Sequence, residues 1–411
     1  MRRSAKFLLA VALTAIVAGL GALLGGPDKP RNVLLIVVDT LRADHLGLYG
    51  YERDTSPRID KQLGGGAVFE RAYSSAPWTA PAVSSLLTSL PVRDHGLVDW
   101  DQPLAEEHLT LTELLEEQGY QTVAVVSHSV LRPGTGFEQG FGVYDFSAGQ
   151  LGSPQETVSS RHVTKKALEA LDGAEEPFFL MLHYFDPHNT YMPHEAYDFG
   201  TRKMDLYDGE IAFTDHAIGR VLRRLEHLDL ADDTLVVLIA DHGEEFRDHG
   251  GSRHSNTLYE ELVHVPLIIR GPGIEAQRVT QVVRNIDVAP TILSLLGLEV
   301  PAAFQGQVIP LQAGLFRPPE GLLAFFETRR FANLRGLVQG DLKLIHDAVS
   351  GQGRVYDLAT DPGEKAPLPV EDYPELTALL AEHTRRPLYA APRVELTDEQ
   401  LLELQQLGYL E

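Results

Sequence analysis

The chain has 411 residues, of which 44% are hydrophobic and 23% charged, with a formal net charge of −23. This length suffices for one large domain with a smaller one attached, or for two domains. The acidic balance excludes nucleic acid or anionic lipid as the main partner, although a locally positive site could still bind an anionic substrate. Because the chain has no cysteine, disulfides, thiolate ligands and a cysteine nucleophile are excluded as well.

The N-terminus has the pattern of an export signal. Arg2, Arg3 and Lys6 precede an uncharged, mostly apolar stretch over residues 7–26. Such a stretch is typical of a signal peptide or a membrane anchor, and its length lies at the border between the two. We expect residues 1–30 to be an uncleaved signal-anchor, with a cleaved signal peptide as the alternative. By the positive-inside rule, the body would face outward from the cell inner membrane, or be periplasmic or secreted after cleavage.

Strands and helices alternate after this segment. Residues 33–38 form an apolar run rich in β-branched side chains, which is typical of a central parallel strand buried on both faces. Similar runs predict strands at Thr122–Val126, Phe178–Tyr184, Leu235–Ala240 and Val265–Ile269. Helical patterns between them predict helices at Thr112–Gln118, Val158–Leu171, Asp205–Leu228 and Ile286–Leu296. The alternation predicts a doubly wound α/β sheet.

The texture of the sequence changes after about residue 310. Short apolar runs separated by Gly and Asp turns predict a small antiparallel sheet from Leu322–Glu327, Leu334–Val338, Leu342–Ile345 and Val355–Leu358. Two terminal helices are predicted at Pro374–His383 and Thr397–Leu407. We therefore expect a main α/β domain over residues 31–310 and a C-terminal subdomain over residues 311–411.

The sequence around Thr79 indicates the start of a helix with a candidate nucleophile. It lies two residues before Pro81 and ahead of a short apolar run, a pattern that predicts a helix with Thr79 at or near its N-cap. Such a helix end attracts anions through its free N–H groups and its dipole. The hydroxyl of Thr79 is thus a candidate nucleophile toward a phosphoryl or sulfuryl group, although a threonine there is by itself usually only a cap.

Two aspartates end predicted strands at the same edge of the sheet. Asp39 follows the first strand, and Asp241, with His242 beside it, follows the strand Leu235–Ala240. Ligands of open α/β sheets bind at this edge. Asp39, Asp241 and His242 could chelate a divalent cation beside Thr79, and this donor set favours Zn²⁺ or Mn²⁺, with Ca²⁺ as an alternative. Each aspartate alone is more often a turn or cap residue. The further donors His183, Asp186 and His249 leave open whether a second metal ion binds.

Several short motifs along the chain form a set with a defined order and spacing. They are Val37–Gly47, Thr79-Ala80-Pro81 followed by Leu86-Leu87-Thr88, Pro187-His188, Asp241-His242-Gly243-Glu244, and Tyr259-Glu260-Glu261 followed by Val265-Pro266-Leu267. The set resembles the sulfatase family of the alkaline phosphatase superfamily. The resemblance implies an alkaline-phosphatase-like helix–sheet–helix sandwich with a small C-terminal antiparallel sheet.

The resemblance also assigns roles to individual residues. Asp39, Asp241 and His242 would be metal ligands, and Thr79 would be both the nucleophile and a further metal ligand. His188 falls on the family's Pro-His histidine, which contacts the substrate and can protonate the leaving oxygen. His254 lies close to the position of an active-site lysine. For His188 and His254, a loop histidine without a catalytic role is the alternative.

The chain also departs from the family pattern. Thr79 stands where sulfatases have the Cys or Ser that becomes formylglycine, and threonine cannot undergo that conversion. Where the family has further charged residues or a histidine, this chain has Thr40, Val83, Ser127 and Ser129, with only His128 nearby. A tetrahedral dianion would thus meet fewer cations than in a sulfatase. A threonine nucleophile instead resembles the phosphotransferases and phosphodiesterases of the same superfamily.

These observations predict a metal-dependent sulfatase-family ester hydrolase. Thr79 favours a phosphate or phosphonate ester over a sulfate ester, with a covalent threonine intermediate. One alternative is a transferase of the phosphoglycerol or phosphoethanolamine type, and another is a catalytically silent anion- or glycan-binding protein. The expected partners are an anionic ester, for which an envelope glycan or lipid is a candidate carrier, and the membrane through residues 1–30. The oligomeric state is left open.

Overall fold

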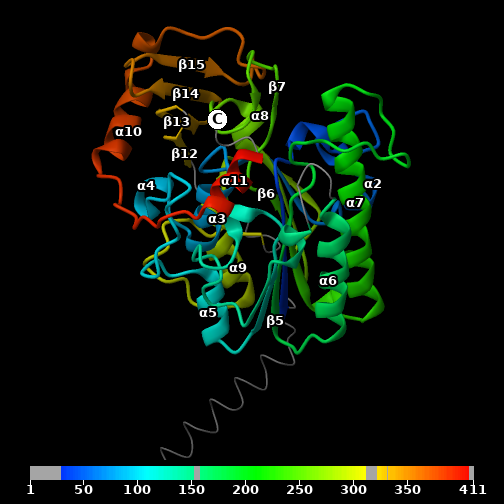
Figure 1. Cartoon of the computed structure of the whole chain (residues 1–411). Helices are drawn as coiled ribbons and strands as arrows, with labels where there is room; N and C mark the ends of the chain where they lie inside the picture. Colours follow the sequence, from blue (N-terminus) through cyan, green and yellow to red (C-terminus); the bar gives the residue numbers. More distant parts are fainter. Residues whose placement is uncertain (1–28, 152–157, 312–321, 331, 407–411) are drawn as a thin grey trace, which may run out of the picture.

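The computed structural model describes residues 29–151, 158–311, 322–330 and 332–406. In this part of the chain, a large sheet lies between two layers of helices, and a small second sheet lies beyond one end of it (Figure 1). The predicted signal-anchor, residues 1–30, falls almost wholly outside the described residues, and the predicted boundary at residue 311 borders a gap. Among the described residues, no helix is both long enough and apolar enough to cross a membrane.

The centre of the large sheet consists of three parallel strands. β1 (Asn32–Val38) lies between β5 (Phe178–Tyr184) and β6 (Thr234–Ala240), and all residues of the three strands are buried. Burial on both faces explains why these strands are continuous apolar runs in the sequence. The remaining strands are β2 (Ala67–Tyr73), β3 (Gln121–Val125), β4 (Val143–Asp145), β9 (His264–Arg270), β10 (Gln277–Val279) and β11 (Val283–Arg284). Their order is β10-β2-β9-β6-β1-β5-β3-β4, with β11 paired to β2.

The large sheet contains both parallel and antiparallel strands. The alternation of strands and helices in the sequence predicted parallel strands only. β9 runs antiparallel to both β6 and β2. A parallel neighbour of β6 would need a long crossover helix, but the chain between β6 and β9 holds only the short hairpin β7 (Glu245–Phe246) and β8 (Ser252–Arg253) and the one-turn helix α8 (Glu260–Val263). The predicted α/β class is confirmed, and the direction of this strand is a correction.

Helices cover both faces of the large sheet. The structure contains α2 (Pro57–Leu63), α3 (Thr79–Thr88), α4 (Val92–His95), α5 (Leu111–Glu117), α6 (Ser160–Asp172), α7 (Lys203–His227) and α9 (Val288–Leu296). α2, α6 and α7 lie on one face, and α3, α5 and α9 lie on the other (Figure 1). The long helix α7 buries Ile211, Ile218, Val221, Leu222 and Leu225, which recur at the helical period.

The C-terminal strands form a separate antiparallel sheet, which confirms the predicted small sheet. Its strands are β12 (Leu323–Thr328), β13 (Leu334–Gln339), β14 (Leu342–Asp347) and β15 (Gly353–Asp357). Successive side chains of a strand point to opposite faces of the sheet. Val338 therefore packs in the cluster around α8, while its neighbour Leu337 packs with α10 (Pro374–Arg385). A last helix, α11, spans Asp398–Gln406.

Candidate active site

The structure brings the two aspartates together at the carboxyl edge of the sheet. Asp39 directly follows β1, and Asp241 directly follows the neighbouring strand β6. The two strands are in register, with Val38 opposite Ala240, so their ends coincide. Ligand atoms of Asp39, Asp241 and His242 all lie within 4.8 Å of one another, and all three residues are buried.

Thr79 points into this cluster from the opposite side. It is the first residue of α3 and follows the N-cap residue Trp78. Its Oγ1 lies 3.4 Å from Asp39 Oδ2 and 3.3 Å from His242 Nε2. The hydroxyl is thus turned toward the carboxylate cluster, at a helix N-terminus whose dipole favours anions.

The orientation of His242 suits metal coordination. Its Nδ1 lies 2.9 Å from the carbonyl oxygen of Gly243, which can only accept, so Nδ1 carries the proton of the neutral ring. Nε2 therefore presents a lone pair, and it lies 3.5 Å from Asp39 Oδ1 and 3.6 Å from Asp241 Oδ2. A backbone carbonyl that fixes the tautomer is the usual support of a metal-ligating histidine.

The two carboxylates lack compensating positive charge. Burial, reinforced by repulsion from Asp241 and Glu244, raises the pKa of Asp39 well above its usual value. Burial also raises the pKa of Asp241 to about 6. Asp39 Oδ1 and Asp241 Oδ2 accept no hydrogen bond from any described residue. The donor set and these orphaned oxygens fit a divalent cation, which would favour the ionised form of both groups.

His188 and His254 lie together beside this cluster. Their ring centroids are 5.0 Å apart, and the ring of His254 lies 4.5 Å from that of His242. His188 directs Nδ1 at its neighbour's carbonyl, Asn189 O, at 2.7 Å. Burial lowers the pKa of both His188 and His254 to about 3, so both rings are neutral at neutral pH. Neutral imidazoles next to a hydroxyl and a carboxylate cluster can take up and return a proton.

Glu244 extends the site behind His254. Glu244 Oε1 lies 3.2 Å from His254 Nδ1, and Glu244 Oε2 accepts a hydrogen bond from Tyr191 Oη at 2.9 Å. All three side chains are buried. Sequence reasoning quoted Glu244 only as part of a motif and gave it no role. No local pattern predicts its contact with His254, because the two residues meet through the β7–β8 hairpin.

Two further histidines complete the cluster. His183 on β5 has Nε2 at 3.8 Å from Asp39 Oδ2 and 4.0 Å from Asp241 Oδ2. His128 Nε2 lies 3.8 Å from Asp39 Oδ2, while its Nδ1 accepts a hydrogen bond from the Val130 N–H. His128 therefore carries its proton on Nε2 and is a donor toward the site. The sequence analysis named His183 as a spare donor, and the register that sets it opposite Val37 is the signal that places it near Asp39.

Other residues singled out in the sequence have structural contacts. Ser127 Oγ donates to His183 O and accepts from Phe185 N, so it holds the end of β5 in place. Asp186 accepts from the N–H groups of Ser159 and Ser160 at the start of α6. His249 lies between Glu261 and the carbonyl of Glu364, away from the Asp39 cluster.

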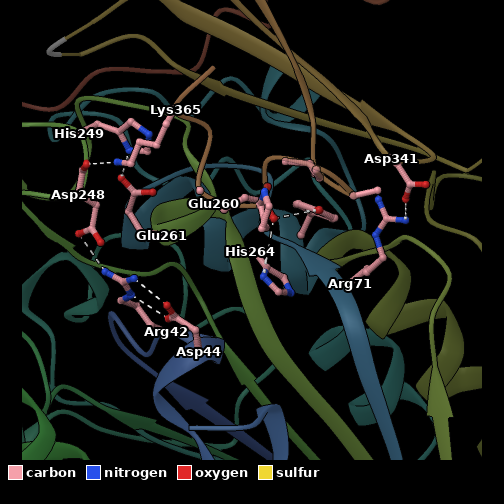
Figure 2. A pocket seen from close by; sticks show the side chains of 15 residues that line it. Arg42, Asp44, Arg71, Asp248, His249, Glu260, Glu261, His264, Asp341 and Lys365 are labelled. Atoms are coloured by element: carbon pink, nitrogen blue, oxygen red, sulfur yellow. Dashed lines mark hydrogen bonds and ion pairs between the residues drawn. The ribbon is translucent and has the colours of Figure 1, made fainter. Parts of the chain in front are cut away.

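A cavity of about 570 Å³ lies between the large sheet and the small sheet, and neither Thr79 nor the Asp39, Asp241 and His242 cluster lines it. Figure 2 shows its charged side chains turned toward one another. Arg42 pairs with Asp44 and Asp248, and Arg71 pairs with Asp341. His249, a spare donor in the sequence analysis, also lines the cavity and contacts Glu261. Because these charges are already paired, this cavity is a weaker candidate site than the Asp39 cluster.

Comparison with protein families places the chain within a known group. The sulfatase model matches residues 31–298, and the model of the N-sulphoglucosamine sulphohydrolase C-terminal region matches residues 251–386. Arylsulfatase K from Mus musculus is 34% identical over 193 residues, a match that covers 44% of this chain and 34% of that protein. Arylsulfatase K from Canis lupus familiaris is 23% identical over 467 aligned positions, which cover 89% of this chain and 83% of the relative.

Solved structures share the fold at low sequence identity. The phosphonate monoester hydrolase of Agrobacterium radiobacter has a TM-score of 0.70 at 20% identity, with 86% of this chain and 94% of that chain covered. A protein solved with its substrate D-glucosamine-2-N,6-O-disulfate has a TM-score of 0.70 at 19% identity, with 87% and 98% covered. These likenesses establish the alkaline-phosphatase-like fold.

Proposed function

The chain belongs to the sulfatase family and is a sulfuric or phosphoric ester hydrolase; within that family, we propose that it cleaves a phosphate or phosphonate ester through a covalent intermediate on Thr79. The observation that carries this proposal is the position of Thr79 Oγ1, 3.4 Å from Asp39 Oδ2 and 3.3 Å from His242 Nε2. Thr79 cannot be converted to the aldehyde that formylglycine sulfatases use, whereas its hydroxyl can attack phosphorus directly.

The proposed reaction has two displacements. In the first, the Thr79 Oγ–P bond forms, the ester O–P bond breaks, and the alcohol leaves after taking a proton. In the second, water attacks the phosphorylated Thr79, the Oγ–P bond breaks, and phosphate or phosphonate is released. The attacking group loses a proton, which Nε2 of neutral His188 or His254 can accept. The same histidine can then return the proton to the departing oxygen.

Asp39, Asp241 and His242 would hold a divalent cation, with Thr79 as a further ligand. When bound there, a Zn²⁺, Mn²⁺ or Ca²⁺ ion would supply Lewis-acid stabilisation of the threonine alkoxide and of the oxygens on phosphorus. The chain's own contribution is orientation. Backbone N–H groups of Thr40 and His242 hold Asp241 Oδ1, and Gly243 O holds the ring of His242.

A sulfate ester is the second candidate substrate, because the two relatives described above are arylsulfatases. One structural neighbour was solved with a disulfated glucosamine, which favours a sugar as the carrier of the ester. We also propose that residues 1–30 direct export and anchor the body outside the cytoplasm. An acceptor alcohol on an envelope glycan or lipid would then be within reach, and transfer to that alcohol is the alternative to attack by water.

A substrate panel with a nucleophile series tests the proposal. The purified protein is supplied with Zn²⁺, Mn²⁺ or Ca²⁺ and assayed on aryl sulfates, phosphate monoesters, phosphate diesters and phosphonates. Thr79→Ala should lose nearly all turnover, while Thr79→Ser should keep a measurable part because the hydroxyl survives. Peptide mass spectrometry after trapping with a slow phosphonate should find the adduct on the Thr79 peptide. An adduct elsewhere, or aryl sulfate cleavage that far exceeds phosphoester cleavage, would overturn the proposal.

A further inference from the structure

A second cavity, of about 370 Å³, adjoins the candidate active site. Its wall includes Asn189 and Tyr191 from the loop after β5, the start of α7, and the β7–β8 hairpin. Asn189 directly follows His188 and Arg253 directly precedes His254, the two histidines whose rings are 5.0 Å apart. The cavity is therefore lined by the direct sequence neighbours of the proposed proton-transfer groups.

The exposed charges around this cavity are positive. Arg202, Lys203, Arg247 and Arg253 line it, and all four are exposed. Its one acidic lining residue, Glu245, is only 3% exposed and accepts hydrogen bonds from the His249 and Gly251 N–H groups of the hairpin. A concentration of cations is unexpected in a chain whose net charge is −23, so it calls for an anionic ligand.

Two of these cations have no acidic partner in the part of the chain that the structure describes. Arg202 pairs with Asp205 through two hydrogen bonds. In contrast, Lys203 makes no ion pair with any described residue, and the guanidinium of Arg247 contacts only the Gly250 carbonyl among them. Lys203 is also the first residue of the 25-residue helix α7, whose N-terminal dipole adds to the positive potential.

Arg253 and Tyr191 link the cavity to the active site. Arg253 lines the cavity from β8, and the next residue along the chain is His254. Tyr191 also lines the cavity, and its Oη donates a hydrogen bond to Glu244 Oε2 at 2.9 Å, behind His254. A ligand that spans both regions would carry one anionic ester at Thr79 and a second anionic group at the cavity.

We propose that this basic pocket, defined by Lys203, Arg247 and Arg253, binds a second anionic group carried by an alcohol that is esterified to the reacting phosphorus. The group is a sulfate, phosphate or carboxylate, all of which pair with Lys and Arg through charge-assisted hydrogen bonds. The inference rests on the proposed function, because it takes the ester to be cleaved at Thr79. It narrows the substrate class to esters with at least two negatively charged groups.

Two synthetic phosphodiesters test this specificity. Both have 4-nitrophenol as the leaving group, and the second alcohol is either propanol or 3-hydroxypropyl phosphate. For the full chain, kcat/KM should be higher for the ester that carries the second anionic group. In the Lys203→Glu/Arg247→Glu variant this preference should fall about tenfold, which corresponds to two exposed charge pairs. The charge-preserving Lys203→Arg/Arg247→Lys variant should keep it, and so should the control Lys165→Glu on the outer surface of α6.

Binding, measured apart from turnover, separates this inference from the proposed function. Calorimetric titration of Thr79→Ala with each ester should show tighter binding of the one with the second anionic group, and the difference should shrink at high ionic strength. The same titration in Thr79→Ala/Lys203→Glu/Arg247→Glu should show no difference. Equal binding of the two esters by Thr79→Ala, or an unchanged preference in the charge-reversed variants, would overturn the basic pocket. Absence of turnover together with the expected binding would overturn only the proposed chemistry.

Discussion

Glu244 Oε1 lies 3.2 Å from His254 Nδ1 in the candidate active site. Because the carboxylate can only accept, it directs the Nδ1 proton of His254 toward itself and leaves Nε2 as the acceptor nitrogen of the neutral ring. Tyr191 Oη donates to the other carboxylate oxygen at 2.9 Å and fixes the orientation of Glu244. Glu244 is thus placed as a positioning residue for the proton-transfer histidine.

Replacing Glu244 by Gln tests this relationship. The amide matches the carboxylate in shape, but its NH₂ group faces either Tyr191 Oη or His254 Nδ1 and cannot accept from it. We expect kcat to fall about tenfold or more with little change in the melting temperature, because the His254 ring loses its anionic partner whichever way the amide is turned. Tyr191→Phe is the matched control, since it removes the other partner only, and its loss should be smaller. A variant with unchanged kcat would contradict the role of Glu244.

The arrangement of Asp39 and Asp241 was predictable from the sequence. Buried parallel strands are continuous apolar runs, so β1 and β6 could be located, and the two aspartates follow them directly. The strand bounds of β5 were also predicted without error. The positions of the strands and of the two aspartates follow from a local sequence pattern and from the rule that ligands bind at the carboxyl edge of such a sheet.

The contacts around Glu244 were not predictable in the same way. His254 returns to Glu244 because the hairpin of β7 and β8 reverses the chain, with Arg247 and Arg253 at positive φ values of 73° and 70°. Such left-handed backbone at non-glycine residues has no simple sequence signature. The antiparallel direction of β9 was missed for a related reason, since it depends on what connects β6 to β9.

Metal binding should depend on Asp241. In Asp241→Asn, the remaining oxygen can still accept from the Thr40 and His242 N–H groups, so the fold should persist. The variant loses one negative donor, and elemental analysis should show a clear drop in bound divalent metal after dialysis. The control is Asp186→Asn, which affects the start of α6 and should leave the metal content unchanged. Equal metal content in Asp241→Asn and the unmodified protein would remove Asp241 from the ligand set.

Glu364 should make the stability of the protein depend on pH. It lies 3.0 Å from the buried Lys343 Nζ, which also pairs with Glu260 at 2.9 Å. Burial raises the pKa of Glu364 from 4.5 to about 7. The folded state therefore holds this proton over a range where the unfolded state has released it, and stability falls as the pH rises from about 4.5 to about 7.

The Glu364→Gln variant should flatten this fall, by at most about 3 kcal/mol across the range. The check is the melting temperature at the two ends of the range in the variant and in the unmodified protein. Glu371→Gln, at an exposed position, should keep the original slope. The assignment would be wrong if Glu364→Gln kept the full slope.

His183 is a buried histidine whose two ring nitrogens have no hydrogen-bond partner among the described residues. Burial lowers its pKa to about 4, so the ring is neutral and both nitrogens are uncompensated polar atoms. An unsatisfied buried polar group costs about 1–3 kcal/mol, so its retention between Asp39 and Asp241 calls for a function. Its Nε2 is close enough to both carboxylates to contribute to the same cation or to orient a group that the cation holds.

This reasoning predicts opposite effects of His183→Phe on the two forms of the protein. Without metal, the apolar ring removes the unsatisfied nitrogens, so the melting temperature in chelator should stay the same or rise. With metal, affinity should fall about 10–100-fold, the usual effect of losing a supporting residue of a metal site, and the metal-induced rise in melting temperature should shrink accordingly. A structural histidine would instead lose stability in chelator and keep its metal affinity, and that pair of results would contradict the prediction.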